Sequence, residues 1–374
     1  MLVPQGEFEL ERVPPDPHLQ AWDAADQYLL KRVDELALPA RHFRILLLND
    51  RFGALAVALA DSHPITINDS FLALLALQRN LSLNGYDADQ VVFDSGLKMP
   101  VTEFDLVLIK LPKSQALLEH QLYGLRRVIG TDTRVMAAGM TRHIHSSTLE
   151  LFETILGPTT TSLAWKKSRL IHVERDRSLT QGDSPYPDCF TVEAGREFRI
   201  CSHANVFSRD RLDNGSRLMI ENLPVSDGYR DIVDLGCGNG ILGIIAAHFN
   251  AGARLTFVDE SYMAVESARL NFETAFHRQR EAEFRVGDCL QGFEPGSVDL
   301  VLNNPPFHQH DAVGDAMAWK MFVESRKALR RGGELWVVGN RHLAYHAKLK
   351  KIFGHCEQVA SNRKFVLLKA VKRD

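Results

Sequence analysis

The sequence has few cysteines, no long apolar run and almost no net charge, and each absence excludes a class of protein. The five cysteines form no C-x-x-C pair, so we expect neither a disulfide framework nor a zinc site, and a reducing compartment fits best. The longest apolar stretches, such as 45–48 and 241–247, are far shorter than the roughly 20 residues of a membrane helix. Residues 1–12 carry glutamates where a signal peptide carries positive charge, so a cytoplasmic, soluble protein is predicted.

The net charge of −3 conceals two basic regions. Residues 326–373 contain 13 lysines and arginines against two glutamates, and residues 110–175 contain 10 against five acidic residues. Charge runs are usually solvated faces, but a local excess of this size also attracts phosphate. The distribution therefore leaves a nucleic-acid partner open.

A segment of turn-forming residues at 176–188 has no apolar period and divides the 374-residue chain into two halves. Since domains have roughly 100 to 200 residues, two domains are predicted, at 1–178 and 188–374.

In the second half, apolar strand-like runs alternate with helix-like periods, which predicts a doubly wound parallel α/β sheet. The predicted strands are 231–235, 254–258, 284–286, 298–302, 334–339 and 364–371, and the predicted helices are 240–248, 261–275 and 316–329.

The first half repeats this order. Residues 66–80 match 256–271 with one residue of slip, 104–108 match 298–302, and the L-R-R of 125–127 matches that of 329–331. An ancestral duplication explains these matches better than chance, so we expect two tandem Rossmann-like domains.

The run D-L-G-C-G-N-G at 234–240 follows a predicted strand and opens a predicted helix. In this context Gly236, Gly238 and Gly240 let backbone N–H groups approach a ligand closely. Asp259 ends the next strand, where its carboxylate suits ribose hydroxyls. The same glycines also fit a dinucleotide fingerprint, so two cofactor interpretations stand at this point.

The run N-P-P-F at 304–307 follows another strand and favours one of them. The two prolines restrict the backbone, so the Asn304 side-chain oxygen and the Pro305 carbonyl can be aimed at one point. Two fixed acceptors suit an –NH2 group, and Phe307 offers a flat face for the ring that bears it. A nicotinamide-dependent enzyme has no use for this arrangement.

Taken together, D-L-G-C-G-N-G, V-D-E-S at 258–261, G-D-C at 287–289 and N-P-P-F resemble the class I S-adenosylmethionine-dependent methyltransferases that act on amino groups. With 203–215, 340–343 and the degenerate first half, nearly the whole chain resembles the bacterial ribosomal RNA guanine-N2 methyltransferases. The similarity is closest to the large-subunit (23S) member, and the small-subunit (16S) member shares the architecture.

The resemblance implies S-adenosylmethionine as cofactor, no metal, and transfer of a methyl group to guanine N2 of rRNA. It assigns Asp234, Gly236, Gly238 and Gly240 to the methionine end, Asp259 to the ribose and Asp288 to the adenine. Phe207 and Ser208 would close over the cofactor, and Asn304, Pro305 and Phe307 would hold the guanine. Asp213, nearby, could equally be a helix N-cap.

The first half departs from this pattern at each chemical position. L-N-D-R-F-G at 48–53 replaces the glycine loop, with Arg51 expected to enter the pocket, and Asn68 or Asp69 stands opposite Asp259. We therefore expect this half to bind RNA without catalysis, unless its basic residues only keep the surface soluble. The predicted contacts are Lys110, Lys113, Lys166, Lys167 and Arg169.

Several alternatives remain on sequence alone: a 16S rRNA enzyme, a glutamine-N5 or adenine-N6 methyltransferase, and an RNA-binding assembly factor with a vestigial cofactor site. An NAD-dependent enzyme is also possible, although N-P-P-F then has no role. Because a base must leave its stack to reach the pocket, naked or partly assembled RNA is the expected substrate.

Overall fold

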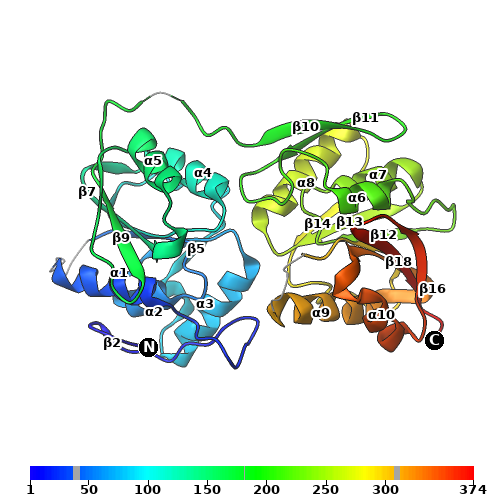
Figure 1. Ribbon diagram of the computed structural model, residues 1–374, viewed down its shortest axis with the longest axis horizontal. Coiled ribbons are helices and arrows are strands. Elements are labelled where there is room, and N and C mark those ends of the chain that lie inside the picture. The colour runs from blue at the N-terminus through cyan, green and yellow to red at the C-terminus, as the bar shows by residue number, and fades with distance from the viewer. Residues whose placement is uncertain (37–42, 181, 307–311) are drawn as a thin grey trace. The chain divides into compact units, whose positions relative to one another are not determined.

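The computed structural model describes residues 1–36, 43–180, 182–306 and 312–374. The chain divides into two compact units, Met1–Tyr186 and Pro187–Asp374 (Figure 1). Each unit is an α/β domain built on a seven-stranded sheet. In the described part of the chain, no helix has the length and apolar character to cross a membrane.

The sheet of the second unit has the order β14-β13-β12-β15-β16-β18-β17. The first five strands of this order are parallel, and β18 runs antiparallel to both of its neighbours. The two tandem Rossmann-like domains are therefore confirmed, but the sheet is mixed where a wholly parallel one was predicted. Its strands are β12 (Asp231–Leu235), β13 (Arg254–Asp259), β14 (Glu283–Val286), β15 (Val298–Asn303), β16 (Leu329–Asn340), β17 (Glu357–Ser361) and β18 (Phe365–Val371).

Helices cover both faces of this sheet. On one face α6, α7 and α8 bury apolar side chains against the strands, and on the other face α9 and α10 do so. The helices are α6 (Asn214–Ile220), α7 (Ile241–Phe249), α8 (Tyr262–Ala275), α9 (Ala312–Ala328), η4 (Arg341–Leu343) and α10 (Tyr345–Phe353). Of these, α10 was not predicted, and neither was strand β17.

The first unit has the same strand order, β5-β4-β3-β6-β7-β9-β8, with β9 antiparallel to β7 and β8. Its strands are β1 (Leu2–Val3), β2 (Gly6–Glu7), β3 (Ile45–Leu48), β4 (Ile65–Ile67), β5 (Val92–Asp94), β6 (Phe104–Lys110), β7 (Ile129–Met140), β8 (Thr159–Thr161) and β9 (Ser168–Val173). Its helices are α1 (Ala24–Glu35), α2 (Ala54–Ala58), η1 (Ala60–Ser62), α3 (Phe71–Leu83), η2 (Ala88–Gln90), α4 (Gln115–Leu125), η3 (Thr141–His143) and α5 (Ser146–Ile155).

Strand register shows which residue of the first unit corresponds to which residue of the second. Leu48 pairs with Ile67 and Ile109, as Leu235 pairs with Val258 and Asn303. Lys110 is therefore the counterpart of Asn304, and Asn68 the counterpart of Asp259, which decides between Asn68 and Asp69.

One sequence match is wrong. Leu125 ends helix α4, whereas Leu329 begins strand β16. Phe104 pairs with Ile129 as Val298 pairs with Leu329, so the counterpart of Leu329 is Ile129 and the shared L-R-R is coincidental.

A hairpin precedes the second sheet, formed by β10 (Asp188–Glu193) and β11 (Glu197–Ser202). Its register pairs Cys189 with Cys201 at a Cα–Cα distance of 4.0 Å, and the two sulfurs are bonded. The prediction of no disulfide is wrong here, because strand pairing joins cysteines whose spacing carries no motif.

Candidate active site

The glycine loop runs from the end of β12 to the start of α7 along the carboxyl edge of the sheet. Gly236, Gly238 and Gly240 have φ values of 70°, 54° and 81°, a region that disfavours side chains. Gly238 N donates to Asp259 Oδ2 at 2.9 Å, and a Cβ there would meet nothing within 4 Å, so this position faces open space.

Gly240 takes part in helix packing, and its predicted ligand contact stays a prediction. Its N–H donates to the Cys237 carbonyl, and a Cβ at Gly240 would lie 2.8 Å from Ala268 Cβ. The missing side chain lets α7 pack closely on α8, so what the structure shows for this glycine is helix packing.

Asp234 lies beneath the loop with 1% of its surface exposed. Its Oδ2 accepts a hydrogen bond from Gly243 N at 2.8 Å, while its Oδ1 is buried with no partner among the described residues. Burial, with a smaller contribution from the negative charge of Asp259, raises the pKa of Asp234 to about 8.

Two consecutive asparagines end strand β15, next to Asp234. Asn303 is fully buried and donates from Nδ2 to the Leu235 carbonyl at 2.8 Å, which ties β15 to β12. Asn304 donates from Nδ2 to Ser216 Oγ of α6 at 3.0 Å. Within the described structure the Oδ1 atoms of both asparagines are buried without a donor, so two amide oxygens are fixed and unsatisfied.

Pro305 follows and is buried, as expected for a rigid continuation of the strand. Phe307, the third residue predicted to hold the target base, lies outside the described residues.

Asp259 ends β13 and accepts hydrogen bonds from backbone N–H groups, namely Gly238 on Oδ2 at 2.9 Å, Ser261 on Oδ1 at 3.0 Å, and Glu260. Burial outweighs these bonds and raises its pKa. A carboxylate has about four acceptor sites, so the group can still accept from a ribose hydroxyl.

Asp288, predicted to contact adenine, forms an ion pair with Lys320 of α9. Lys320 also lies 3.8 Å from Glu324, whose carboxylate accepts from Leu290 N. The Asp288 turn is therefore anchored to α9 through a lysine that sequence reasoning missed.

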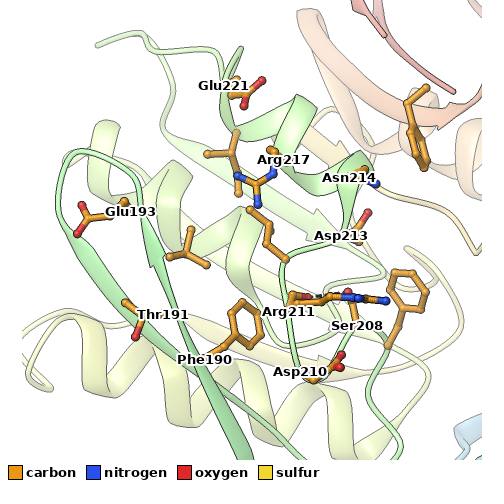
Figure 2. A pocket seen from close by; sticks show the side chains of 15 residues that line it. Phe190, Thr191, Glu193, Ser208, Asp210, Arg211, Asp213, Asn214, Arg217 and Glu221 are labelled. Atoms are coloured by element: carbon orange, nitrogen blue, oxygen red, sulfur yellow. Dashed lines mark hydrogen bonds between the residues drawn. The ribbon is translucent and has the colours of Figure 1, made fainter. Parts of the chain in front are cut away.

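Residues 203–213 form the loop before α6. Ser208 has a φ of 52° and its Oγ donates to the Arg211 carbonyl at 2.7 Å, while Phe207 is 65% exposed. Both line a cavity of about 950 Å³ (Figure 2), and none of Asp234, Asp259 and Asn304 is among its described lining residues. Asp213 accepts from Gly215 N and Ser216 N, so it is the N-cap of α6.

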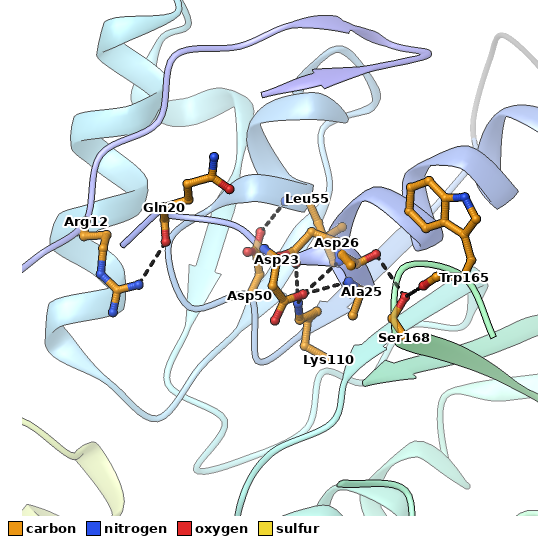
Figure 3. A network of polar contacts seen from close by, with 11 residues as sticks. Arg12, Gln20, Asp23, Ala25, Asp26, Asp50, Leu55, Lys110, Trp165 and Ser168 are labelled. Atoms are coloured by element: carbon orange, nitrogen blue, oxygen red, sulfur yellow. Dashed lines mark hydrogen bonds and ion pairs between the residues drawn. The ribbon is translucent and has the colours of Figure 1, made fainter. Parts of the chain in front are cut away.

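In the first unit the position that corresponds to Asn304 is occupied by Lys110, which forms ion pairs with two aspartates. Lys110 Nζ lies 2.6 Å from Asp23 Oδ1 and 2.8 Å from Asp26 Oδ1 (Figure 3), and its side chain is 14% exposed. Burial lowers the pKa of Lys110, but the two carboxylates outweigh burial and raise it, so the ammonium stays charged. Lys110 is therefore not free for RNA, contrary to the prediction.

The glycine-loop counterpart in this unit is also filled. Asn49 has the φ of Gly236, 63° against 70°, and exchanges two side-chain hydrogen bonds with Gln121 at 2.9 and 2.8 Å. Arg51, expected to enter the pocket, is exposed, and its guanidinium lies 5.1 Å from the centre of the Phe52 ring.

The other predicted RNA contacts differ in access. Lys113, Lys166 and Lys167 are exposed, and Arg169 is half-buried. Lys166 Nζ lies 4.6 Å from the centre of the Trp165 ring and donates to Gln27 Oε1 at 3.3 Å. Three of the five therefore present charge to solvent.

Sequence reasoning missed three residues of the site, namely Asn303, Ser216 and Lys320. Asn303 carried a signal, since two polar residues end an otherwise apolar strand. Ser216 and Lys320 act through residues distant in sequence, and no local pattern marks them. No group of three or more His, Cys, Asp or Glu residues able to hold a metal occurs among the described residues.

The strand order, the glycine loop, the acidic end of β13 and the N-P-P turn define an α/β domain of the class I methyltransferase type. Two family models match the chain, the RLMG N-terminal domain over residues 1–177 and the methyltransferase small domain over residues 197–369.

Curated relatives named ribosomal RNA large subunit methyltransferase G match almost the full length. The protein from Streptomyces griseus is 48% identical over 99% of this chain and 98% of its own, and that from Klebsiella pneumoniae (strain ATCC 700721) is 49% identical over 98% and 96%. The chain belongs to the ribosomal RNA large subunit methyltransferase G family.

A solved structure has the same fold. The T. thermophilus 16S rRNA N2 G1207 methyltransferase (RsmC), in complex with AdoMet and guanosine, superposes with a TM-score of 0.74 at 22% identity, covering 94% of this chain and 92% of that one.

Proposed function

We propose that the protein transfers a methyl group from S-adenosylmethionine to the exocyclic N2 amine of a guanine in large-subunit (23S) rRNA. The observation that carries this proposal is a set of three buried oxygens without a donor among the described residues, at or near the carboxyl ends of neighbouring strands: Asp234 Oδ1, Asn303 Oδ1 and Asn304 Oδ1. A buried acceptor without a donor costs about 1–3 kcal/mol, so a site that keeps three of them fits a ligand that brings N–H donors.

The cofactor fits this edge of the sheet. A methionine ammonium would supply donors to Asp234, whose carboxylate has one unsatisfied oxygen and no neighbouring cation among the described residues. The open space at Gly238 leaves room beside Asp259, whose remaining acceptor capacity suits a ribose hydroxyl. S-adenosylmethionine, when bound, supplies an electrophilic methyl group on a sulfonium.

Asn304 and Pro305 orient the acceptor amine. Ser216 holds the Asn304 amide by its Nδ2, so Oδ1 is fixed and can accept one N2–H of guanine. The Pro305 carbonyl, held by the proline ring, can accept the other. Two acceptors favour the pyramidal nitrogen in which charge develops, so they bind the transition state more strongly than the planar ground state.

The guanine must leave its base stack to reach Asn304, which favours naked or partly assembled rRNA as the substrate, in the cytoplasm. The first unit supplies RNA affinity without chemistry: Asn49 and Lys110 occupy the positions of Gly236 and Asn304, and Lys113, Lys166 and Lys167 face solvent. Proposed domains are therefore residues 1–178 for RNA binding and 188–374 for catalysis.

The test is methylation in vitro of protein-free 23S and 16S rRNA from a strain lacking the gene, followed by nucleoside analysis. N2-methylguanosine in 23S rRNA alone supports the proposal. The same product in 16S rRNA would favour the small-subunit activity, and N6-methyladenosine would refute guanine as the target. Methylation of a protein that persists after ribonuclease treatment would favour a glutamine-N5 enzyme.

A further inference from the structure

The turn between β17 and β18 presents two adjacent cations, Arg363 and Lys364, both exposed. Arg341, which directly follows β16, lies beside them, since its N–H donates to the Lys364 carbonyl at 3.0 Å. In the described part of the chain none of the three forms an ion pair with a carboxylate. By contrast, Lys348 of α10 and Lys369 of β18 each form an ion pair with a carboxylate.

The turn is held rigid by its own hydrogen bonds. Asn362 N donates to the Phe365 carbonyl at 3.0 Å, and Asn362 Oδ1 accepts from Lys364 N at 3.0 Å and Phe365 N at 2.8 Å. Arg341 Nη2 donates to Ser361 Oγ at 3.0 Å. The backbone that carries these charges is therefore fixed before any ligand arrives, which reduces the entropy cost of binding.

The turn lies at the sheet edge that holds the asparagine site. Asn303 pairs with Val337 of β16, and Asn340, three residues further on, pairs with Phe365. Two steps of about 4.7–4.9 Å across β16 and three residues of about 3.3 Å along it place Phe365 roughly 14 Å from Asn303. Charges at this distance from a bound guanine can reach the phosphates that flank it.

The first unit carries the same feature at the same place. Met140 pairs with Ser168 as Asn340 pairs with Phe365, so Lys166 and Lys167 are the counterparts of Arg363 and Lys364. Thr141 N donates to the Lys167 carbonyl at 2.8 Å, as Arg341 N does to Lys364. Lys166 and Lys167 have φ values of 47° and 63°, a conformation unfavourable for lysine.

The glycine loop and the asparagine site have not been retained in the first unit, whereas the basic turn has. We propose that Arg341, Arg363 and Lys364 form a phosphate-binding site that grips the backbone of the RNA strand carrying the target guanine. The inference rests on the proposed function, because it takes that RNA strand as the ligand. The residues that would bind its phosphates are separate from those proposed to bind the cofactor and the guanine.

The test compares Arg363→Gln/Lys364→Gln with Arg331→Gln/Arg373→Gln in the full chain. The control removes the same charge at the opposite, amino edge of the same sheet, where both arginines are exposed. Filter binding of protein-free 23S rRNA is measured from 50 to 300 mM salt, with S-adenosylmethionine affinity by calorimetry and KM and kcat for RNA.

The turn variant should weaken RNA binding roughly 20-fold at 0.1 M salt and flatten the log–log salt slope by about 1.4, since each single-strand phosphate contact contributes about 0.7. KM for RNA should rise, while kcat and the affinity for S-adenosylmethionine should remain near wild type. The RNA affinity of the control variant should stay within about twofold of wild type. An unchanged slope, or an equal effect of both variants, would overturn the proposal.

A charge-conserving variant, Arg363→Lys/Lys364→Arg, separates charge from fold. It should retain RNA affinity, and loss of binding in this variant would likewise overturn the phosphate assignment. Nucleoside analysis of the wild-type product tests the proposed function independently, because RNA affinity is measured without turnover.

Discussion

Lys110 and Asp26 form an ion pair, 2.8 Å from Nζ to Oδ1, at the position in the first unit where Asn304 donates to Ser216 Oγ in the second. The equivalence is complete: Lys110 and Asn304 share a strand position, and Asp26 and Ser216 each lie three residues after the N-cap aspartates Asp23 and Asp213. In the second unit the neutral pair of Asn304 and Ser216 leaves the Asn304 Oδ1 without a donor among the described residues. In the first unit the charged pair of Lys110 and Asp26 occupies the equivalent position.

Because Lys110 is paired with Asp26, its replacement should lower the stability of the chain rather than its affinity for RNA. Lys110→Ala should destabilise the chain by about 3–5 kcal/mol, because Asp26, 5% exposed, would be left as a buried carboxylate without its cation. Lys110→Asn combined with Asp26→Ser should recover most of this loss by restoring the neutral pair of the second unit. Urea unfolding checks both variants, and a lower RNA affinity with unchanged stability for Lys110→Ala would contradict the structural role.

Asn304→Ala should leave S-adenosylmethionine affinity near wild type and lower methyl transfer by roughly a hundredfold or more, as loss of an aimed polar contact in a transition state does. Ser216→Ala is the matched control: it keeps the Asn304 oxygen and removes only its anchor, so a smaller loss is expected. Single-turnover kinetics and calorimetry give the two quantities. Turnover of Asn304→Ala at the wild-type rate would remove this residue from the reaction.

Asp259→Ala should weaken S-adenosylmethionine binding by about 1.5–3 kcal/mol for each charge-assisted hydrogen bond lost to the ribose. Because Asp259 also accepts from Gly238 N and Ser261 N, Asp259→Asn, which keeps an acceptor oxygen, should lose less. A calorimetric titration measures both, and equal affinities for wild type and Asp259→Ala would show that the ribose lies elsewhere.

Asp234 predicts a pH dependence of stability. Its pKa is raised from 3.8 to about 8, so the folded chain binds more protons than the unfolded chain between these values and loses stability as pH rises through that window. Asp234→Asn should therefore raise Tm more at pH 9 than at pH 5 in the absence of cofactor.

Asp299, on β15 of the same sheet, has a pKa that is lowered, whereas the pKa of Asp234 is raised. Burial raises its pKa, but hydrogen bonds from Arg330 and from the backbone of Asp231 and Arg230 outweigh burial and lower it. Asp299→Asn should therefore lower Tm at pH 7, where wild type holds the charged form. Scanning fluorimetry across pH compares the two variants, and a Tm gain for Asp234→Asn that is the same at both pH values would show that its carboxyl does not titrate there.

The basic turn of the first unit can be tested in the same way as that of the second. Lys166→Gln/Lys167→Gln should weaken binding of protein-free 23S rRNA and flatten its salt dependence, with cofactor affinity unchanged. The control is Arg134→Gln/Arg177→Gln, which removes two exposed charges at the amino edge. If both variants bind RNA like wild type, the first unit does not contact RNA through this turn.

Sequence patterns predicted the second sheet well, because its parallel strands are mostly apolar runs and the glycine loop and the N-P-P turn each begin where one of them ends. They also predicted Lys110 as an RNA contact. What they could not show was that Asp23, 87 residues away, and Asp26 would neutralise that lysine, since partners so distant in sequence leave no local signal.

The same limit explains the remaining errors. The bond between Cys189 and Cys201 depends on the register of the hairpin, which the spacing of the two cysteines does not reveal. The two L-R-R runs look alike in sequence, but one begins at the end of helix α4 and the other at the start of strand β16. Sequence patterns also gave no sign that the missing side chain of Gly240 permits a close contact with Ala268 of another helix.

We infer that the fixed oxygen of Asn304 directs the methyl group onto guanine N2 of large-subunit rRNA. The most direct measurement is mass spectrometry of 23S rRNA from a strain lacking the gene, complemented with wild type or with Asn304→Ala expressed at the same level. We predict one N2-methylguanosine restored by wild type and absent with Asn304→Ala. Restoration of the mark by Asn304→Ala would show that this oxygen is not needed for methyl transfer. A wild-type product on any other base or on 16S rRNA would show that guanine N2 of 23S rRNA is not the target.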